Sequence, residues 1–410
     1  MIKGNMIVGQ SGGPTAAINA TLAGVYCEAK TLGIKTVYGM LGGVQGFFDG
    51  KLAELDSILY DAEQIEILKQ TPAAALGSCR FKLPSHNENV KFYEEIFEKF
   101  NKLDIKYFVY IGGNDSMDTI SKLSSYAKEV DSDIKFVGAP KTIDNDLPIT
   151  DHTPGFGSAA KYIASTVKEV VRDCSVYTMK SVTIIEIMGR NAGWLTASAA
   201  LAKGDDCCGV DFIYLPESPF DLDECINKIR KLHEEKNTVV IAVSEALRNK
   251  NGEYISSGGS VFAKEDAFGH KIMSGTAQFL SEYIGRKLGV KVRGIELNTP
   301  QRCAAHLASK QDIDESFSAG AAAAKAAIDG KSGEMVVINR TSDRPYSYGI
   351  STAPIEMIAN IEKTIPQEWI TDDKAGVTDD FINYCRPLIQ GEMPIIFKDG
   401  LPRHLVIDEN

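Results

Sequence analysis

Apolar runs that end in a glycine-containing turn recur along this chain of 410 residues and limit the folds open to it. The run Tyr107–Ile111 is almost uninterrupted, and the turn Gly112–Asp115 follows it directly. Such a run is typical of a parallel strand buried on both faces. Helical segments alternate with similar runs at Met6–Gly9, Ser181–Ile187 and Thr238–Val243. The pattern predicts an α/β fold with parallel sheets.

The composition excludes several classes of protein. A formal net charge of −11 argues against a nucleic acid as the main partner, because binding many phosphates needs a basic face. The eight cysteines form no CxxC pair, which is typical of a reducing compartment, so we expect a cytoplasmic protein. No apolar run is long enough to span a bilayer, and the short apolar start is no signal peptide, so we expect no membrane partner.

Two turns have a composition that suits phosphate chemistry. Gln10–Thr15, with Gly12 and Gly13, lies between an expected strand and an expected helix, where free backbone N–H groups bind anions. It matches neither a Walker A sequence nor GxGxxG, and a tight turn needs glycine in any case. Ala139–Asp146 places a lysine, a hydroxyl, two carboxylates and an amide after a strand that Pro140 ends. This set suits phosphoryl transfer, although Asn145 and Asp146 could simply cap the next helix.

Other polar residues at expected strand ends have two readings each. Asp115 and Asp118 could cap a helix or bind Mg²⁺. Arg80 could be a surface residue or could reach a phosphate. Arg190, Glu217 and Glu245 follow strands, where ligands bind in α/β folds, but each could also form a surface salt bridge. Residues 250–271 are polar and glycine-rich and are expected to form a hairpin or an exposed excursion.

Taken together, the junctions resemble the 6-phosphofructokinase family over most of the chain. Seven motifs carry the resemblance in the family's order, each at an expected strand end: Gly12–Thr15, Gly77–Phe81, Gly112–Ser116, Pro140–Asp146, Met188–Arg190, Ser244–Glu245 and Pro300–Arg302. The resemblance implies two doubly wound, Rossmann-like domains of the phosphofructokinase fold. Residues 1–155 with about 300–350 would bind the phosphoryl donor, residues 156–299 would bind the sugar phosphate, and residues 351–410 would be a C-terminal extension.

The resemblance also implies residue roles. Asp144 resembles the general base that takes the proton of the sugar hydroxyl, and Arg80 resembles the arginine that contacts the transferred phosphate. Gly12 and Gly13 would contact the donor. Arg293 corresponds to an arginine that the family donates across a subunit interface, which implies a homodimer or homotetramer. The sugar-phosphate site would comprise Thr142, Ile143, Asp144, Met188, Gly189, Arg190, Glu245, Arg293 and Arg302.

Two positions resemble the pyrophosphate-dependent branch of the family. ATP users typically carry glycine where this chain has Asp115 and Lys141. The Asp115 carboxylate would occupy space and repel the inner phosphate of a nucleotide. The Lys141 ammonium could neutralise a pyrophosphate leaving group. The implied reaction is a Mg²⁺-dependent, reversible transfer from pyrophosphate to the 1-hydroxyl of fructose 6-phosphate.

The chain departs from the family pattern at three positions. Asn114 replaces the usual metal-binding aspartate, so the metal ligand could be Asn114 or Asp115, with Asp144 or Asp146 as further candidates. Ser181, beside Lys180, replaces an intersubunit arginine, and Thr299 replaces a histidine. Two alternative functions stay open: an ATP-dependent 6-phosphofructokinase, and a non-catalytic sugar-phosphate sensor on the same fold.

Overall fold

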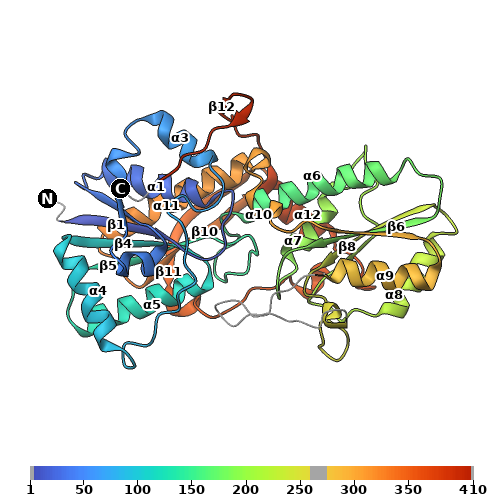
Figure 1. Cartoon of the computed structure of the whole chain (residues 1–410), viewed down its shortest axis with the longest axis horizontal. Helices are drawn as coiled ribbons and strands as arrows, with labels where there is room; N and C mark the ends of the chain where they lie inside the picture. The colour runs from blue at the N-terminus through green and yellow to red at the C-terminus, as the bar shows by residue number, and fades with distance from the viewer. Residues whose placement is uncertain (1–3, 259–274, 408–410) are drawn as a thin grey trace.

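A computed structural model describes residues 4–258 and 275–407 of the chain. The expected excursion at residues 250–271 falls partly outside the described residues. Two lobes, each built around its own sheet, lie side by side with a waist between them (Figure 1).

The larger sheet has seven strands in the order β11-β10-β5-β4-β1-β2-β3. Its five inner strands are parallel, and the two edge strands, β3 and β11, pair antiparallel. The strands are β1 (Asn5–Gln10), β2 (Val37–Met40), β3 (Leu52–Glu54), β4 (Ile105–Gly112), β5 (Lys135–Pro140), β10 (Glu334–Asp343) and β11 (Tyr346–Pro354). The chain enters this sheet, leaves it after β5, and returns to it about two hundred residues later at β10.

Helices cover both faces of this sheet because side chains along each inner strand alternate between two apolar cores. Val109 and Ile111 of β4 face α1 (Ile18–Thr31), α3 (Ala62–Gln70) and α11 (Lys310–Ile328). Phe108 and Tyr110 face α2 (Gly43–Phe48), α4 (Val90–Lys102) and α5 (Asn114–Glu129). The sheet is therefore doubly wound.

Helices α1 and α11 cross with their backbones in close approach. A Cβ atom on Gly24 would lie 2.0 Å from the carbonyl oxygen of Phe317, and one on Gly320 would lie 2.0 Å from that of Thr21. Neither position can take a larger residue without separating the helices. This crossing joins the first helix of the lobe to its last.

The smaller sheet is all parallel, in the order β7-β8-β6-β9. Its strands are β6 (Ser181–Ile187), β7 (Phe212–Tyr214), β8 (Thr238–Ser244) and β9 (Lys291–Glu296). One face packs on α6 (Phe156–Cys174) and α7 (Trp194–Ala197), and the other packs on α8 (Leu222–Leu232) and α9 (Thr276–Leu288). The edge strand β9 is exposed along most of its length.

The chain after β11 crosses from the larger lobe to the smaller one. Phe381, Tyr384 and Leu388 complete the apolar core between the smaller sheet and α6. The elements of this part are η5 (Ile355–Met357), η6 (Gln367–Trp369), α12 (Asp379–Cys385), η7 (Arg386–Ile389), β12 (Phe397–Lys398) and β13 (Leu401–Pro402). The remaining short helices are η1 (Leu55–Ser57), η2 (Ser198–Ala202), η3 (Ile255–Gly258), α10 (Pro300–Cys303) and η4 (Ala305–Leu307).

The predicted fold class is confirmed. The structure differs from the expectation in the length of β10 and in the presence of β11. The sequence predicts a strand at Glu334–Asn339 and irregular structure from about residue 351. Strand β10 instead continues to Asp343, and β11 runs on to Pro354. Beyond Ile338, β10 alternates between exposed and half-buried residues, and β11 is mostly half-buried, so both strands lack the continuous apolar run that marks a fully buried strand. Among the described residues, no helix has the length and apolarity that crossing a membrane requires.

Candidate active site

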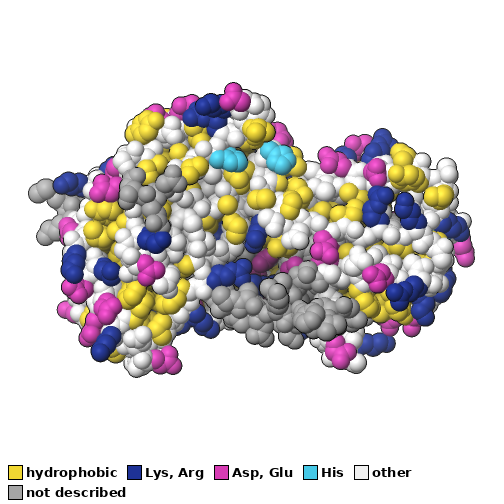
Figure 2. Space-filling model, viewed as in Figure 1, with side chains coloured by type: hydrophobic (Ala, Val, Ile, Leu, Met, Phe, Trp, Pro, Cys, Tyr) yellow, Lys and Arg dark blue, Asp and Glu magenta, His cyan; other side chains and the backbone are white. Residues whose placement is uncertain are grey.

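A cleft of about 480 Å³ opens between the two lobes at the carboxyl ends of the parallel strands. Charged side chains of both signs gather at this waist (Figure 2). The residues that line the cleft are Gly12, Gly13, Pro14, Thr15, Arg80, Gly113, Asn114, Asp115, Ser116, Lys141, Thr142, Ile143, Asp144, Asp146, Met188, Arg190, Asn191, Ala192, Glu245, Arg302, Asn360 and Glu362. Most of the sequence-predicted site residues therefore lie together.

The turn after β1 forms the wall of the cleft on the side of the larger lobe. Gly12 has a φ of 78°, which favours glycine, and its carbonyl oxygen accepts a hydrogen bond of 2.6 Å from the Ser78 hydroxyl. The Thr15 hydroxyl accepts a bond of 2.9 Å from the backbone N–H of Ile18 at the start of α1. These two bonds fix the conformation of the turn, and both glycines line the cleft.

Lys141 directly follows β5 and lies beneath the glycine turn. Its side chain is 3% exposed, and its Nζ donates a hydrogen bond of 2.6 Å to the carbonyl oxygen of Gly13. Burial lowers the pKa of Lys141 to about 8, although Asp144 and Asp146 act in the opposite direction. A buried ammonium next to two glycines, which have no side chains to block a ligand, is suited to neutralising a bound anion.

The two carboxylates of the turn after β5 share a desolvated environment. Burial raises the pKa of Asp144 above its ordinary value, against the lowering effect of Arg190 and Lys141. Burial, and then the Asp144 carboxylate, raise the pKa of Asp146 to about 7. A carboxylate with a raised pKa accepts a proton more readily than an exposed one does. The arrangement can therefore support general base chemistry inside the cleft.

Charged side chains that follow β6 and β8, and one on α10, complete the lining of the cleft. Arg190 follows β6, Glu245 follows β8, and Arg302 lies on α10. Gly189 does not line the cleft, but its backbone N–H donates a bond of 3.2 Å to Oε1 of Glu245. Burial, and then Asp144, raise the pKa of Glu245 to about 8. Nε of Arg302 is buried without a hydrogen-bond partner among the described residues.

Asn360–Ile365, which we call the bridging segment, closes one side of the cleft. Lys363 joins it to both lobes, because its N–H donates to the carbonyl oxygen of Asp146 at 2.7 Å and its own carbonyl accepts from Nε1 of Trp194 at 3.0 Å. Glu362 accepts bonds of 3.2 Å from Nδ2 of Asn191. Asn360, Glu362 and Asn191 are not among the residues predicted from the sequence, because no motif marks the segment.

The side chain of Asn114 forms hydrogen bonds with the bridging segment. Its Oδ1 accepts a hydrogen bond from the backbone N–H of Asn360, and its Nδ2 donates one of 2.8 Å to the carbonyl oxygen of Ile361. The neutral amide both accepts and donates here, whereas an ionised aspartate only accepts and would lose the second bond. The two bonds give a physical reason for the departure from the family pattern at residue 114.

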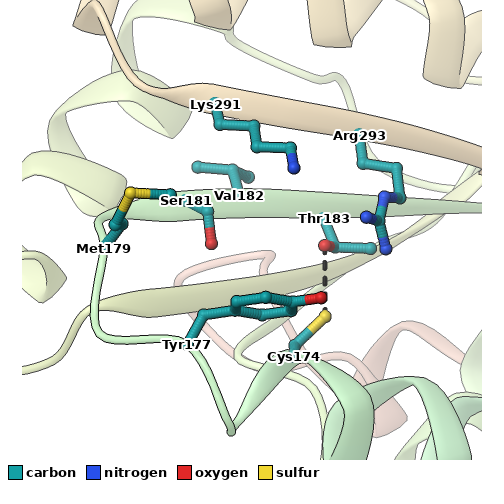
Figure 3. Close-up of a pocket in the computed structure, with 8 residues that line it drawn as sticks. All are labelled: Cys174, Tyr177, Met179, Ser181, Val182, Thr183, Lys291 and Arg293. Carbon is teal, nitrogen blue, oxygen red and sulfur yellow. Dashed lines mark hydrogen bonds between the residues drawn. The ribbon is translucent and has the colours of Figure 1, made fainter.

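Two further predicted residues have other places in the structure. Glu217 does not line the cleft, and its Oε1 accepts bonds from the backbone N–H groups of Gly193 and Ile365 at 2.7 and 3.2 Å. Arg293 lies on β9 and lines a different cavity, with Tyr177, Met179 and Lys291 (Figure 3). Its side chain is 45% exposed and pairs with Asp173 at 3.6 Å. Within one chain, Arg293 is not part of the cleft.

The cleft has one feature that fits a magnesium ion. Oδ1 of Asp146 is buried and has no hydrogen-bond partner among the described residues. No group of three or more His, Cys, Asp or Glu side chains is placed to hold a metal within the ranges that the structure covers. Mg²⁺ commonly takes one or two carboxylates and completes its shell with water and substrate phosphate oxygens. The residues present fit that mode of binding.

Comparison with known proteins agrees with the geometry. The family profile described as Phosphofructokinase matches residues 5–326. A protein from Xanthomonas campestris pv. campestris (strain B100) named pyrophosphate–fructose 6-phosphate 1-phosphotransferase is 40% identical over 408 residues, covering 99% of this chain and 96% of that protein. One of the same name from Halomonas elongata is 38% identical over 98% of this chain and 96% of its own length. The crystal structure of a pyrophosphate-dependent phosphofructokinase from Nitrosospira multiformis is 34% identical and superposes with a TM-score of 0.89, covering 99% of this chain and 97% of that one.

Proposed function

The chain belongs to the phosphofructokinase family, and from that membership we propose that it transfers a phosphoryl group from pyrophosphate to the 1-hydroxyl of fructose 6-phosphate. The products are fructose 1,6-bisphosphate and phosphate, and the step is reversible. The observation that carries the choice of donor is the buried Lys141 ammonium beneath the Gly12–Gly13 turn, in the cleft that Asp115 also lines. A cation there complements a compact anion, and the Asp115 carboxylate disfavours a nucleotide.

The reaction follows from the positions of three side chains. Asp144 accepts the proton of the sugar hydroxyl as the hydroxyl oxygen forms a bond to the terminal phosphorus of pyrophosphate. The bridging P–O bond breaks, and Lys141 stabilises the charge that develops on the leaving phosphate. Arg80, on the loop that bonds to the Gly12 turn through Ser78, lines the same cleft and would contact the transferred group.

Binding of the sugar phosphate is assigned to the side of the smaller lobe. Met188, Arg190, Glu245 and Arg302 line the cleft, and Gly189 orients the Glu245 carboxylate through its backbone N–H. Thr142 and Ile143 complete this site next to Asp144. Asp146, together with Asp144 or Asp115, would hold Mg²⁺, which neutralises phosphate charge when bound. Both ends of the Asn114 amide already bond to the bridging segment, so we favour these carboxylates, and not Asn114, as the metal ligands.

Initial rates with the two donors test the choice of donor. We expect turnover with pyrophosphate and a kcat/KM for ATP lower by about 100-fold or more, because the Asp115 carboxylate occupies space and repels the inner phosphate of a nucleotide. Turnover with ATP and none with pyrophosphate would assign the chain to the ATP-dependent kinases. Binding of fructose 6-phosphate with no turnover on either donor, unchanged in Asp144→Ala, would instead identify a sensor.

The position of Arg293 supports a homo-oligomer. Its guanidinium lies outside the cleft of its own chain, on an exposed edge strand beside Tyr177 and Met179, which are 47% and 63% exposed. A second copy that covers this edge would bring Arg293 to the sugar-phosphate site of its neighbour. Lys180 and Ser181 adjoin the same face, at the start of β6.

We expect Arg293→Ala to raise KM for fructose 6-phosphate by about 10-fold with little change in kcat, since a lost arginine–phosphate contact weakens binding. Arg286→Ala is the matched control, because Arg286 is an exposed arginine on α9. Analytical ultracentrifugation should show a dimer or larger. A monomer, or a KM that Arg293→Ala leaves unchanged, would contradict the shared site.

The same family membership supports the domain division and the location. We propose that residues 1–155 with about 300–350 form the donor domain, that residues 156–299 form the sugar-phosphate domain, and that residues 351–410 form a C-terminal extension. All eight cysteines are free thiols, in keeping with a reducing cytoplasm.

A further inference from the structure

The C-terminal part of the chain contacts the catalytic turn, and we propose that Tyr384 is a positioning residue for Asp144. This inference rests on the proposed role of Asp144 as the general base. Tyr384 belongs to α12, more than two hundred residues from the turn, and its side chain is 9% exposed. Its hydroxyl accepts a hydrogen bond of 2.8 Å from Nδ2 of Asn145 and donates one of 2.8 Å to the carbonyl oxygen of Asp151.

Asn145 determines the direction of the turn. It lies between Asp144 and Asp146, is fully buried, and has a φ of 54°, a left-handed conformation that asparagine adopts more readily than most residues. Its carboxamide is held at both ends, since Oδ1 accepts a bond of 3.1 Å from the N–H of Thr153. Rotation of Asn145 would turn both flanking carboxylates, so the Tyr384 hydroxyl fixes the direction in which Asp144 points.

Tyr384 is itself firmly placed. The Arg340 guanidinium lies over its ring at 4.7 Å and donates a bond of 2.9 Å to its carbonyl oxygen. The rings of Trp194 and Trp369 lie 5.4 and 5.3 Å from the tyrosine ring. A hydroxyl on so constrained a ring has little freedom to follow Asn145, which is what a positioning contact requires.

The bridging segment holds the other end of the same turn. The N–H of Lys363 donates to the carbonyl oxygen of Asp146 at 2.7 Å, and its Nζ donates to the carbonyl oxygens of Thr150 and Asp151 at 3.1 and 2.8 Å. The residues from 351 onward thus contact the catalytic turn at two points and, through Asn114, the neighbouring turn as well. These contacts give the extension a role in the reaction rather than in packing alone.

Two tyrosine-to-phenylalanine variants separate positioning from packing. Tyr346, on β11, also packs on Arg340, at 5.2 Å, but its hydroxyl bonds to Glu315 at 2.5 Å and does not touch the turn. We expect Tyr384→Phe to lower kcat by about 10- to 100-fold, with KM for both substrates within about twofold of the wild type. We expect Tyr346→Phe to leave kcat within about twofold.

The outcomes are distinguishable whatever the donor. The assay uses the donor that supports turnover in the wild type, so failure with pyrophosphate contradicts the proposed function and not the role of Tyr384. A kcat that Tyr384→Phe leaves unchanged, or an equal loss in both variants, overturns the inference. A crystal structure of Tyr384→Phe should show the Asn145 carboxamide and the Asp144 carboxylate displaced. An unmoved turn also overturns the inference, even if no donor supports turnover.

Discussion

Replacing Asp144 by asparagine should lower kcat by about 10³-fold while fructose 6-phosphate still binds. The amide has the shape of the carboxylate but cannot accept the hydroxyl proton, and general base catalysis contributes about 10²- to 10⁴-fold. Burial raises the pKa of Asp144, so the wild-type carboxylate is a stronger base than an exposed aspartate. Initial rates with pyrophosphate, together with calorimetric titration of the sugar phosphate, measure both parts of the expectation.

The control for this variant is Asp133→Asn. Asp133 is an exposed carboxylate, 69% accessible, that pairs with Lys106 far from the cleft, so its loss should leave the rates unchanged. If Asp144→Asn retained kcat within tenfold of the wild type, another group would have to be the base.

Lys141→Met should lower kcat/KM for pyrophosphate by about 10²- to 10³-fold, since the loss of one preorganised group that stabilises developing charge has effects of this size. Methionine keeps most of the apolar stem and removes the ammonium that reaches the carbonyl oxygen of Gly13. Steady-state rates over a range of pyrophosphate concentrations give the ratio.

Lys161→Met is the matched control for that substitution. Lys161 is also largely buried, and its Nζ also donates to a glycine carbonyl, that of Gly391, at 2.6 Å, but it lies outside the cleft. The Lys161→Met variant should be less stable than the wild type but should keep its kcat/KM for pyrophosphate. If Lys141→Met had a normal kcat/KM for pyrophosphate and the Lys161→Met control also folded, Lys141 would not determine the choice of donor.

The strands and turns that carry the chemistry could be predicted because their signals are local. The apolar run at Tyr107–Ile111 corresponds to β4, and its terminal turn lines the cleft. Carboxyl ends of parallel strands meet at one edge, so residues as distant as Gly12, Lys141 and Glu245 could be expected to converge.

The rest of the site depends on contacts that leave no local pattern. The bridging segment has no apolar periodicity, and its position follows from bonds to Asn114, Asp146 and Trp194 that exist only in the folded chain. The bond between Asn145 and Tyr384 joins residues 239 positions apart. The family resemblance likewise groups Arg293 with the sugar-phosphate residues, whereas in a single folded chain Arg293 lies on the edge strand β9, outside the cleft.

The close crossing of α1 and α11 has a consequence for synthesis on the ribosome. Domains generally form as the chain emerges, beginning from the N-terminus. Here α1 emerges early but lacks one of its packing partners until α11 has been translated, and the smaller lobe completes its core only with α12. Neither lobe has its full core while the last part of the chain is missing. The face of α1 that carries Gly24 must therefore remain uncovered until α11 has been made.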